Sequence, residues 1–249
     1  MTESGVFDPT LNVDTLLFPD PILLASSQHP EMQAAKVLFD EHFDKVRRLL
    51  LHSSGDPTHA AWKAASRLLS FPEISGTCLG YGSNSISGSG AGPTMTQKLL
   101  KTGYQIVQMG IDDPDLFMAI GLFEEDFGPD LIGDMFTNVC FQSIIDFNAR
   151  VYEELSIATK HYNITLKNGI SYEGRFARNP TVTSHDIPII LMPVDILRDL
   201  PVALDWRGVQ AVSENNREFR KGLNGSVASL WSRKTLESKA QLKEWALSS

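Results

Sequence analysis

A helical repeat of apolar residues between Gly128 and Leu155 constrains this chain more than any other feature of its sequence. Apolar side chains recur there at steps of three and four for about six turns. They are Ile132, Met135, Phe136, Val139, Ile144, Phe147 and Val151. Such a repeat places one continuous apolar face on a helix. We therefore predict a single long core helix over residues 128–155.

Other segments carry the same amphipathic pattern over shorter lengths. Helices are predicted over residues 30–51, 58–69 and 94–109, with Phe71-Pro72 following the second, because proline disfavours helical conformation in the residue before it. A short helix is predicted after Asp112-Asp113-Pro114, where acids would face the positive helix end. The last forty residues also show helical periodicity, so the chain is predicted to be mostly helical.

Two segments have the character of strands. Residues 163–173 alternate apolar and polar side chains around Asn168-Gly169, a pair that favours a type I′ hairpin turn. Residues 187–194 form a continuous apolar run that suits a strand buried on both faces, although Pro188 and Pro193 indicate a position near a sheet edge. The predicted class is therefore α/β, of the α+β kind: mostly helical with a small sheet.

Length and composition favour an ordinary globular protein. The chain has 249 residues with 42% hydrophobic content, enough for one domain over 1–249, which could consist of a helical part, 1–158, and a mixed strand and helix part, 159–249. Its two cysteines give no disulfide framework, and no basic, apolar leader or membrane-length apolar run is present. We expect a cytoplasmic protein with no membrane partner.

Charge is divided unevenly along the chain. Between Lys101 and Arg150 there are nine carboxylates and no Lys, Arg or His, whereas residues 207–244 hold eight bases and four acids. Unpaired carboxylates repel one another. An acidic stretch of this kind is therefore solvated, pairs with basic groups from elsewhere in the chain, or binds a hard cation. Docking of the basic tail on the acidic middle and contact of the tail with a phosphate backbone are both compatible with this division.

The acidic stretch contains a candidate metal site. Five carboxylates occur within residues 124–134, and Asp130, Asp134 and Asn138 follow at intervals of four, so they line one helical stripe. Mg²⁺ or Mn²⁺ could bind there through Glu125, Asp130 and Asp134, with Glu124 in support. The alternative is that these acids complement the dipole of a helix start and form a solvated loop.

The segment after the apolar run, Pro193 to Pro201, is a second candidate. Loops at strand ends often line clefts in α/β proteins, so Asp195, Arg198 and Asp199 could support a site. Equally, Arg198 could pair with either acid and fix the loop.

The basic tail supplies candidate partner-binding residues. Asn216, Arg217, Arg220 and Lys221 form a polar helical face that could contact nucleic acid or another protein, or could hydrogen-bond a neighbouring loop.

Familiar catalytic signatures are absent from the sequence. There is no Gly-x-Ser-x-Gly elbow, no HExxH zinc motif and no cysteine-nucleophile signature. The glycine-rich stretch 76–93 precedes a predicted helix, but Pro93-Thr94 stand where a P-loop requires Lys and Ser/Thr, so a flexible connector is favoured over a phosphate cradle.

Four motifs together resemble a group of uncharacterised bacterial proteins. They are Gly-Ser-Gly-Ala-Gly at 88–92, Gly-Ile-Asp-Asp-Pro-Asp-Leu-Phe at 110–117, Gly-Pro-Asp-Leu-Ile-Gly-Asp-Met at 128–135 and Asp-Ile-Leu-Arg-Asp-Leu-Pro at 195–201. The resemblance covers most of the chain and corresponds to the N-terminal half of longer members, which carry a C-terminal PD-(D/E)xK-like nuclease domain. It departs at Gly133, where the family tends to have Ser. The resemblance implies a setting in restriction or phage defence.

Two functions therefore follow as hypotheses. The first is a non-catalytic recognition or assembly module of a bacterial nucleic-acid-directed system, whose partner is nucleic acid or another protein of that system. The second is a phosphodiesterase or nuclease that depends on Mg²⁺ or Mn²⁺ and uses the acidic cluster 124–134. A third reading, a structural protein whose acidic segment keeps it soluble or docks the tail, stays open.

Overall fold

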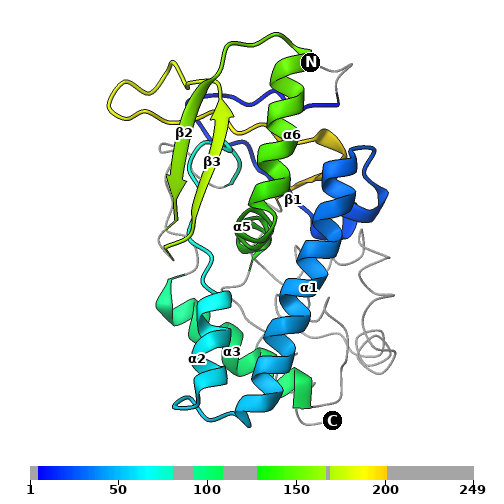
Figure 1. The fold of residues 1–249 in the computed structure, drawn as a ribbon, viewed down its shortest axis with the longest axis vertical. Helices are drawn as coiled ribbons and strands as arrows, with labels where there is room; N and C mark the ends of the chain where they lie inside the picture. Colours follow the sequence, from blue (N-terminus) through cyan, green and yellow to red (C-terminus); the bar gives the residue numbers. More distant parts are fainter. Residues whose placement is uncertain (1–4, 81–91, 109–127, 167–168, 201–249) are drawn as a thin grey trace. The chain divides into compact units, whose positions relative to one another are not determined.

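The computed structural model describes residues 5–80, 92–108, 128–166 and 169–200, and they form helices with short antiparallel strands (Figure 1). This is the predicted mixed class, mostly helical. The chain divides into two compact units, and each is described by itself. Unit 1 contains residues 1–39, 71–91 and 130–200, and unit 2 contains residues 40–70, 92–129 and 201–249. The predicted division into 1–158 and 159–249 stays a prediction.

Within its described residues, unit 2 contains helices joined by turns. It holds the second half of α1 (Pro30–Ser53), together with α2 (Ala60–Leu68) and α3 (Pro93–Gln108), close to the three helices predicted from the sequence. The rings of Trp62 on α2 and Tyr104 on α3 meet edge to face, with centroids 6.0 Å apart. Thr96 donates a hydrogen bond to the carbonyl of Leu69 at 3.3 Å, which ties the start of α3 to the end of α2.

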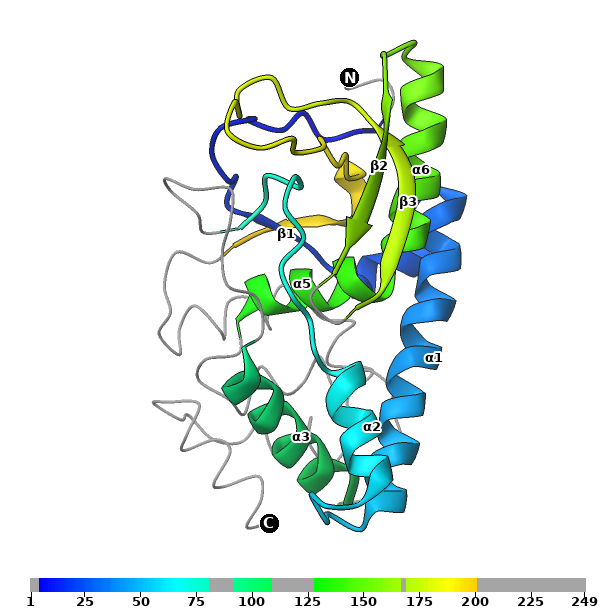
Figure 2. The same cartoon turned by 60° about the vertical axis from the view of Figure 1, so that its left-hand side comes forward.

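The long helix predicted over 128–155 is two helices. They are α5 (Pro129–Val139) and α6 (Phe141–Glu154), and the break is at Cys140, whose ψ of 16° is far from the helical value. Figure 1 shows α5 nearly end on at the lower end of the upright α6, and Figure 2 shows it running sideways to that end of α6. Because both helices bury an apolar face, the repeat continues through the break. The prediction of one helix was wrong for this reason.

The predicted hairpin is confirmed. Strands β2 (Lys160–Thr165) and β3 (Ser171–Phe176) pair antiparallel, and their inner face packs on α6, where the rings of Phe141 and Tyr172 meet at 5.0 Å. Residues 167–168 lie outside the described part of the chain, so the type I′ turn stays a prediction. Beside them, the N–H of Leu166 donates to the carbonyl of Ile170, and Gly169 has a φ of +87°.

The apolar run 187–194 is continuously buried only over residues 190–193, and it is not a regular strand. Ile190, Leu191 and Met192 are at most 4% exposed, as predicted, yet isolated bridges occur only at Pro188 and Pro193. Proline removes a ladder donor at both positions. The segment instead bonds to several neighbours in turn, with the N–H of Ile190 donating to the carbonyl of Gly76 at 2.8 Å.

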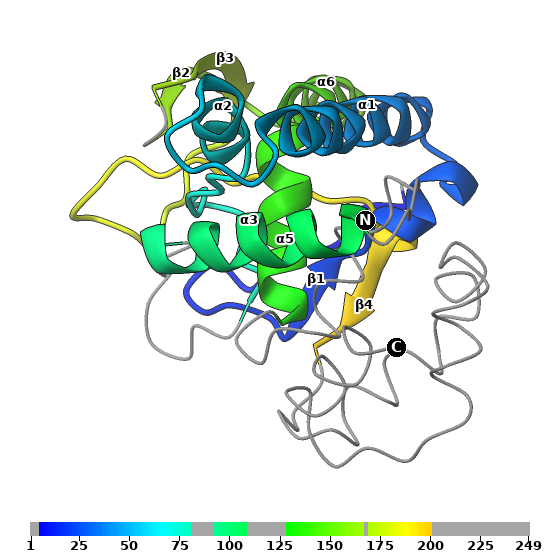
Figure 3. The same cartoon turned by 90° about the horizontal axis from the view of Figure 1, so that it is seen from below.

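A regular pairing begins just after this run. A 3-10 helix, η4 (Val194–Ile196), leads into β4 (Leu197–Asp199), which pairs antiparallel with β1 (Leu17–Pro19) as Figure 3 shows. A second 3-10 helix, η2 (Pro21–Ser26), follows β1. The short strands therefore bring the N-terminal segment beside residues 194–200.

Candidate functional site

The polar stripe predicted from the spacing of Asp130, Asp134 and Asn138 lies on α5. Pro129 starts the helix, so Asp130 stands in its first turn, while Leu131, Met135 and Phe136 on the same helix are buried. Asp130 is exposed, Asp134 is half-buried and Asn138 is buried. The stripe thus runs from solvent into the interior of unit 1.

Two further carboxylates from distant parts of the sequence lie at this stripe. A Cβ placed on Gly80 would stand 3.0 Å from Oδ1 of Asp130 and 3.6 Å from Oδ2 of Asp14. The charge of Glu73 acts on Asp134 closely enough to raise its pKa. We call Asp14, Glu73, Asp130 and Asp134 the carboxyl cluster.

Backbone pairing holds Asp14 at this position. The N–H of Thr15 donates to the carbonyl of Cys78 at 2.9 Å, and the N–H of Gly80 donates to the carbonyl of Thr15 at 3.0 Å, around a parallel bridge between Thr15 and Leu79. Gly80 has a φ of +133°, which glycine adopts readily, and its lack of a side chain leaves room for the carboxylates.

The cluster is electrostatically unfavourable in its ionised form. Burial, and then the charges of Asp130 and Glu73, raise the pKa of Asp134 from its ordinary value of 3.8 to about 8. Loss of water around its carboxyl group also raises the pKa of Asp130. Burial, and then the charge of Asp14, raises the pKa of the Cys78 thiol to about 11. A proton or a cation would relieve this repulsion.

Asn138 ties the stripe to the segment that carries Glu73. Its Nδ2 donates to the carbonyl of Pro72 at 2.7 Å and to the carbonyl of Asp134 at 2.9 Å. The side chain is 8% exposed, and its Oδ1 accepts no hydrogen bond from the described residues. The amide group therefore lies between the backbones that bear Asp134 and Glu73.

The predicted metal set is only partly within the described residues. Glu124 and Glu125 lie outside them, as do Asn216, Arg217, Arg220 and Lys221. In the part of the chain that is described, no three His, Cys, Asp or Glu side chains are arranged to hold a metal ion together. Mg²⁺, however, commonly uses one or two carboxylates and completes its shell with waters and substrate phosphate. Asp130 and Asp134 could meet that smaller requirement.

The other candidate acids of the sequence have different surroundings. Asp195 accepts hydrogen bonds from the Ser27 hydroxyl at 3.0 Å and from the Gln28 N–H at 2.7 Å, just before α1 begins. Asp199 is exposed on β4. These contacts give Asp195 a structural role at the entry to α1. Its support of a metal site stays a prediction.

Arg198 fixes its loop, but through a partner that the sequence did not indicate. Its Nε donates to Oδ2 of Asp20 at 2.5 Å, and Asp20 is 1% exposed. Asp20 also caps η2 by accepting from the N–H of Ile22. The expected pairing with Asp195 or Asp199 was therefore wrong, because β1 pairs with β4 and brings Asp20 to the arginine.

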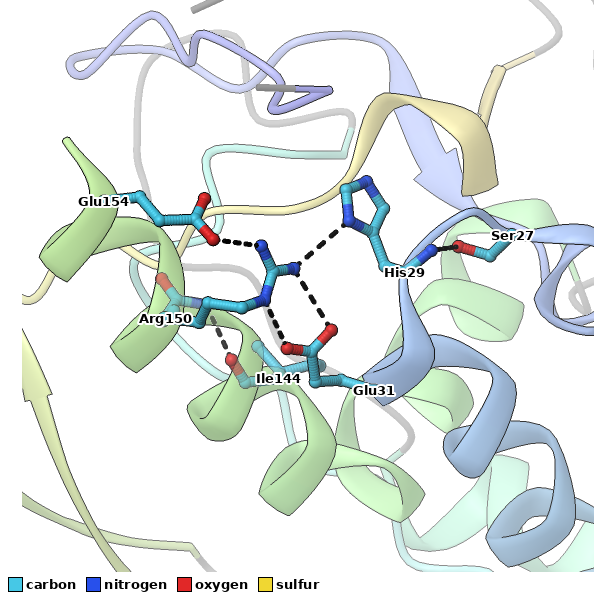
Figure 4. Close-up of polar contacts among 7 residues, drawn as sticks. Ser27, His29, Glu31, Ile144, Arg150 and Glu154 are labelled. Atoms are coloured by element: carbon cyan, nitrogen blue, oxygen red, sulfur yellow. Dashed lines mark hydrogen bonds and ion pairs between the residues drawn. The ribbon is translucent and has the colours of Figure 1, made fainter. Parts of the chain in front are cut away.

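A separate polar network surrounds Arg150 on α6 (Figure 4). The guanidinium donates to Glu31 at 2.6 Å, to Glu154 at 3.0 Å and to Nδ1 of His29 at 3.2 Å. The bond to Arg150 lowers the pKa of Glu31. The guanidinium is bonded to three partners, two of which lie at the start of α1. We therefore interpret the network as structural: it holds α6 against the start of α1.

None of the helices within the described ranges is long and apolar enough to cross a membrane.

Comparison with known proteins identifies a family but no function. A family model described as a domain of unknown function, DUF8370, matches residues 1–205. No curated protein and no solved structure shows significant similarity to the chain. The match spans every described element from β1 to β4. The chain therefore belongs to the DUF8370 family.

Proposed function

We propose that the carboxyl cluster binds a divalent cation, Mg²⁺ or Mn²⁺, and uses it to cleave phosphodiester bonds. The observation that carries the proposal is the crowding of Asp134, whose pKa rises to about 8 from burial and from the charges of Asp130 and Glu73. Carboxylates forced together in this way repel one another unless a proton or cation joins them. Hard divalent cations prefer such oxygen ligands.

Dipole complementation alone does not account for the arrangement. Acids stabilise a helix when they lie within its first turn, which covers Asp130 but not Asp134 in the second turn. Asp134 is half-buried, where an ionised carboxylate loses hydration. A bound cation would supply the compensating charge.

The chemistry would follow from the ion and its two aspartates. Asp130 and Asp134 would hold the cation, and Glu125 is the further ligand that the sequence suggests, with Glu124 in support. A cation there would polarise a phosphoryl oxygen and lower the pKa of a bound water, which could then attack phosphorus. The open coordination positions would go to the substrate and that water.

The test is cleavage of a generic phosphodiester, bis(p-nitrophenyl) phosphate, and of labelled DNA and RNA, with Mn²⁺, Mg²⁺ or EDTA present. We expect cation-dependent cleavage that Asp130→Asn/Asp134→Asn abolishes. Asp146→Asn, which neutralises an exposed acid on α6, is the matched control and should retain activity. Absence of cleavage by the wild-type chain with every substrate and cation would reject the enzymatic proposal.

A second candidate is a recognition or assembly module of a bacterial nucleic-acid-directed system, acting in the cytoplasm on nucleic acid or on another protein of that system. The charge division favours it, since residues 207–244 hold eight bases against four acids. Neutralising Arg217, Arg220 and Lys221 should weaken nucleic-acid binding and reduce its salt dependence. Asn216→Ala should weaken binding with little change in salt dependence. Binding that none of these substitutions alters would reject this candidate.

A further inference from the structure

Large apolar side chains are exposed on one side of α1. Val37 is 57% exposed, Leu38 is 42% exposed and Leu51 is 46% exposed. A single exposed apolar side chain is common on protein surfaces, but several on one side of a helix are typical of a contact surface. Because α1 is one continuous helix, helical geometry alone fixes the spacing of these side chains. This side of α1 is therefore a candidate interface.

The same side of the helix carries charges in a definite order. Exposed residues recur along it at steps of three and four, which places them on one line along the helix. They are Ala34, Leu38, Glu41, Lys45, Arg48 and His52, and we call them the α1 stripe. Val37 and Leu51 border the stripe on a common flank. Along the stripe, apolar residues come first, the acid follows, and the bases come last.

This order of charges is complementary to itself when a second copy of α1 runs antiparallel. If Glu41 lies opposite Lys45 of the second copy, then Lys45 lies opposite Glu41 of the second copy, because a two-fold interface repeats every contact. Two attractive ion pairs result from one register. A parallel arrangement would instead place like charges next to each other at both positions. The charge pattern thus favours a second copy of the chain, in the antiparallel direction.

The antiparallel register also covers the apolar side chains. It places Leu38 opposite Arg48 of the second copy, whose aliphatic stem can lie over the leucine. It places Leu51 of the second copy at the level of Ala34 and Val37, and the two-fold symmetry repeats this contact at the other end. Removal of these side chains from water is the main favourable contribution to association.

We infer that the α1 stripe is the interface of a homodimer, in which a second copy of this chain packs its own α1 antiparallel on the first. One helix from each chain makes a small interface, so the dimer should be weak and its population should depend on concentration. The inference goes beyond the proposed function and does not depend on cation binding by the carboxyl cluster.

Sedimentation equilibrium of the full chain over a range of concentrations tests this interface. We expect the wild type to exchange between monomer and dimer. Glu41→Lys and Lys45→Glu should each weaken dimerisation by about tenfold, because either change places like charges across the interface. Leu38→Gln should also weaken it, because an apolar contact is lost. Lys63→Glu reverses a charge at an exposed position of α2, so this matched control should dimerise like the wild type.

An equimolar mixture of the two charge variants separates a specific contact from a loss of folding. One variant carries only bases at the two positions and the other carries only acids, so both contacts are attractive again in a mixed dimer. We expect the mixture to dimerise at least as tightly as the wild type, while circular dichroism shows wild-type helix content in both variants.

Two kinds of result would overturn the inference. A wild-type chain that stays monomeric at every concentration would do so and would leave the α1 stripe to a different partner. A wild-type dimer that both charge variants retain, or a mixture of helical variants that stays monomeric, would place the dimer contact elsewhere on the chain.

Discussion

Replacing Asp134 with asparagine should make the folded chain more stable at neutral and alkaline pH. In the folded chain the pKa of Asp134 is about 8, whereas an unfolded chain has the ordinary value near 3.8. Below pH 4 the carboxyl is protonated in both states and has no pH-dependent effect. Between pH 4 and 8 the unfolded chain loses its proton first, so the free energy of unfolding falls as the pH rises.

The size of this effect follows from the shift in pKa. One pKa unit corresponds to about 1.4 kcal/mol, so ionisation of Asp134 in the folded chain costs about 6 kcal/mol, and structural relaxation lowers the measured value. Asparagine has nearly the same shape and carries no charge. The difference in unfolding free energy between Asp134→Asn and the wild type should therefore increase by several kcal/mol from pH 5 to pH 8.

Urea denaturation at pH 5, 6, 7 and 8, without divalent cations, measures this difference. Asp146→Asn serves as the control, because Asp146 is exposed on α6 and its substitution should leave the pH trend of the wild type unchanged. Comparison between the variants removes every pH-dependent contribution that the three chains share. If Asp134→Asn follows the same pH trend as the wild type, the account of a crowded, buried carboxyl is refuted.

Three other substitutions test the structural framework of the site. Asn148→Ala should lower the free energy of unfolding by about 3 kcal/mol, because it leaves both backbone groups of Leu191 without their buried partners; urea denaturation measures this, and a loss below 1 kcal/mol would contradict it. Gly80→Ala should lower the free energy of unfolding by about 1–3 kcal/mol, because φ is +133° and the new Cβ would stand 3.0 Å from a carboxylate oxygen of the cluster. A thermal unfolding midpoint equal to that of the wild type would contradict this strain. Arg198→Ala should destabilise the chain by about 3 kcal/mol, since it removes the guanidinium from the buried Asp20. Arg198→Lys should recover part of this loss in the same denaturation assay. Equal losses in Arg198→Ala and Arg198→Lys would contradict a role for the positive charge.

Local patterns in the sequence predicted most of the secondary structure. The helices α1, α2 and α3 begin and end within two residues of their predicted limits, because each has a regular apolar period and clear end signals. The hairpin followed from alternation around Gly169. The break at Cys140 could not be predicted, since the apolar repeat is the same on both sides of it.

The candidate site was only half predictable. Spacing alone placed Asp130, Asp134 and Asn138 on one stripe, because a helix brings residues four apart together. Asp14 and Glu73 reach that stripe through tertiary pairing, and no sequence spacing connects them with α5. The burial of Asn138 likewise depends on its bond to Pro72, 66 residues away.

The most direct test of the account is calorimetric titration of the chain with Mn²⁺ and Mg²⁺, comparing the wild type with Asp130→Asn/Asp134→Asn. The account predicts micromolar Mn²⁺ binding by the wild type and none by the double variant, because the two aspartates are the charged ligands. Wild-type chain that binds neither cation, or a double variant that binds Mn²⁺ as tightly as the wild type, would contradict the central claim that the carboxyl cluster is a cation site.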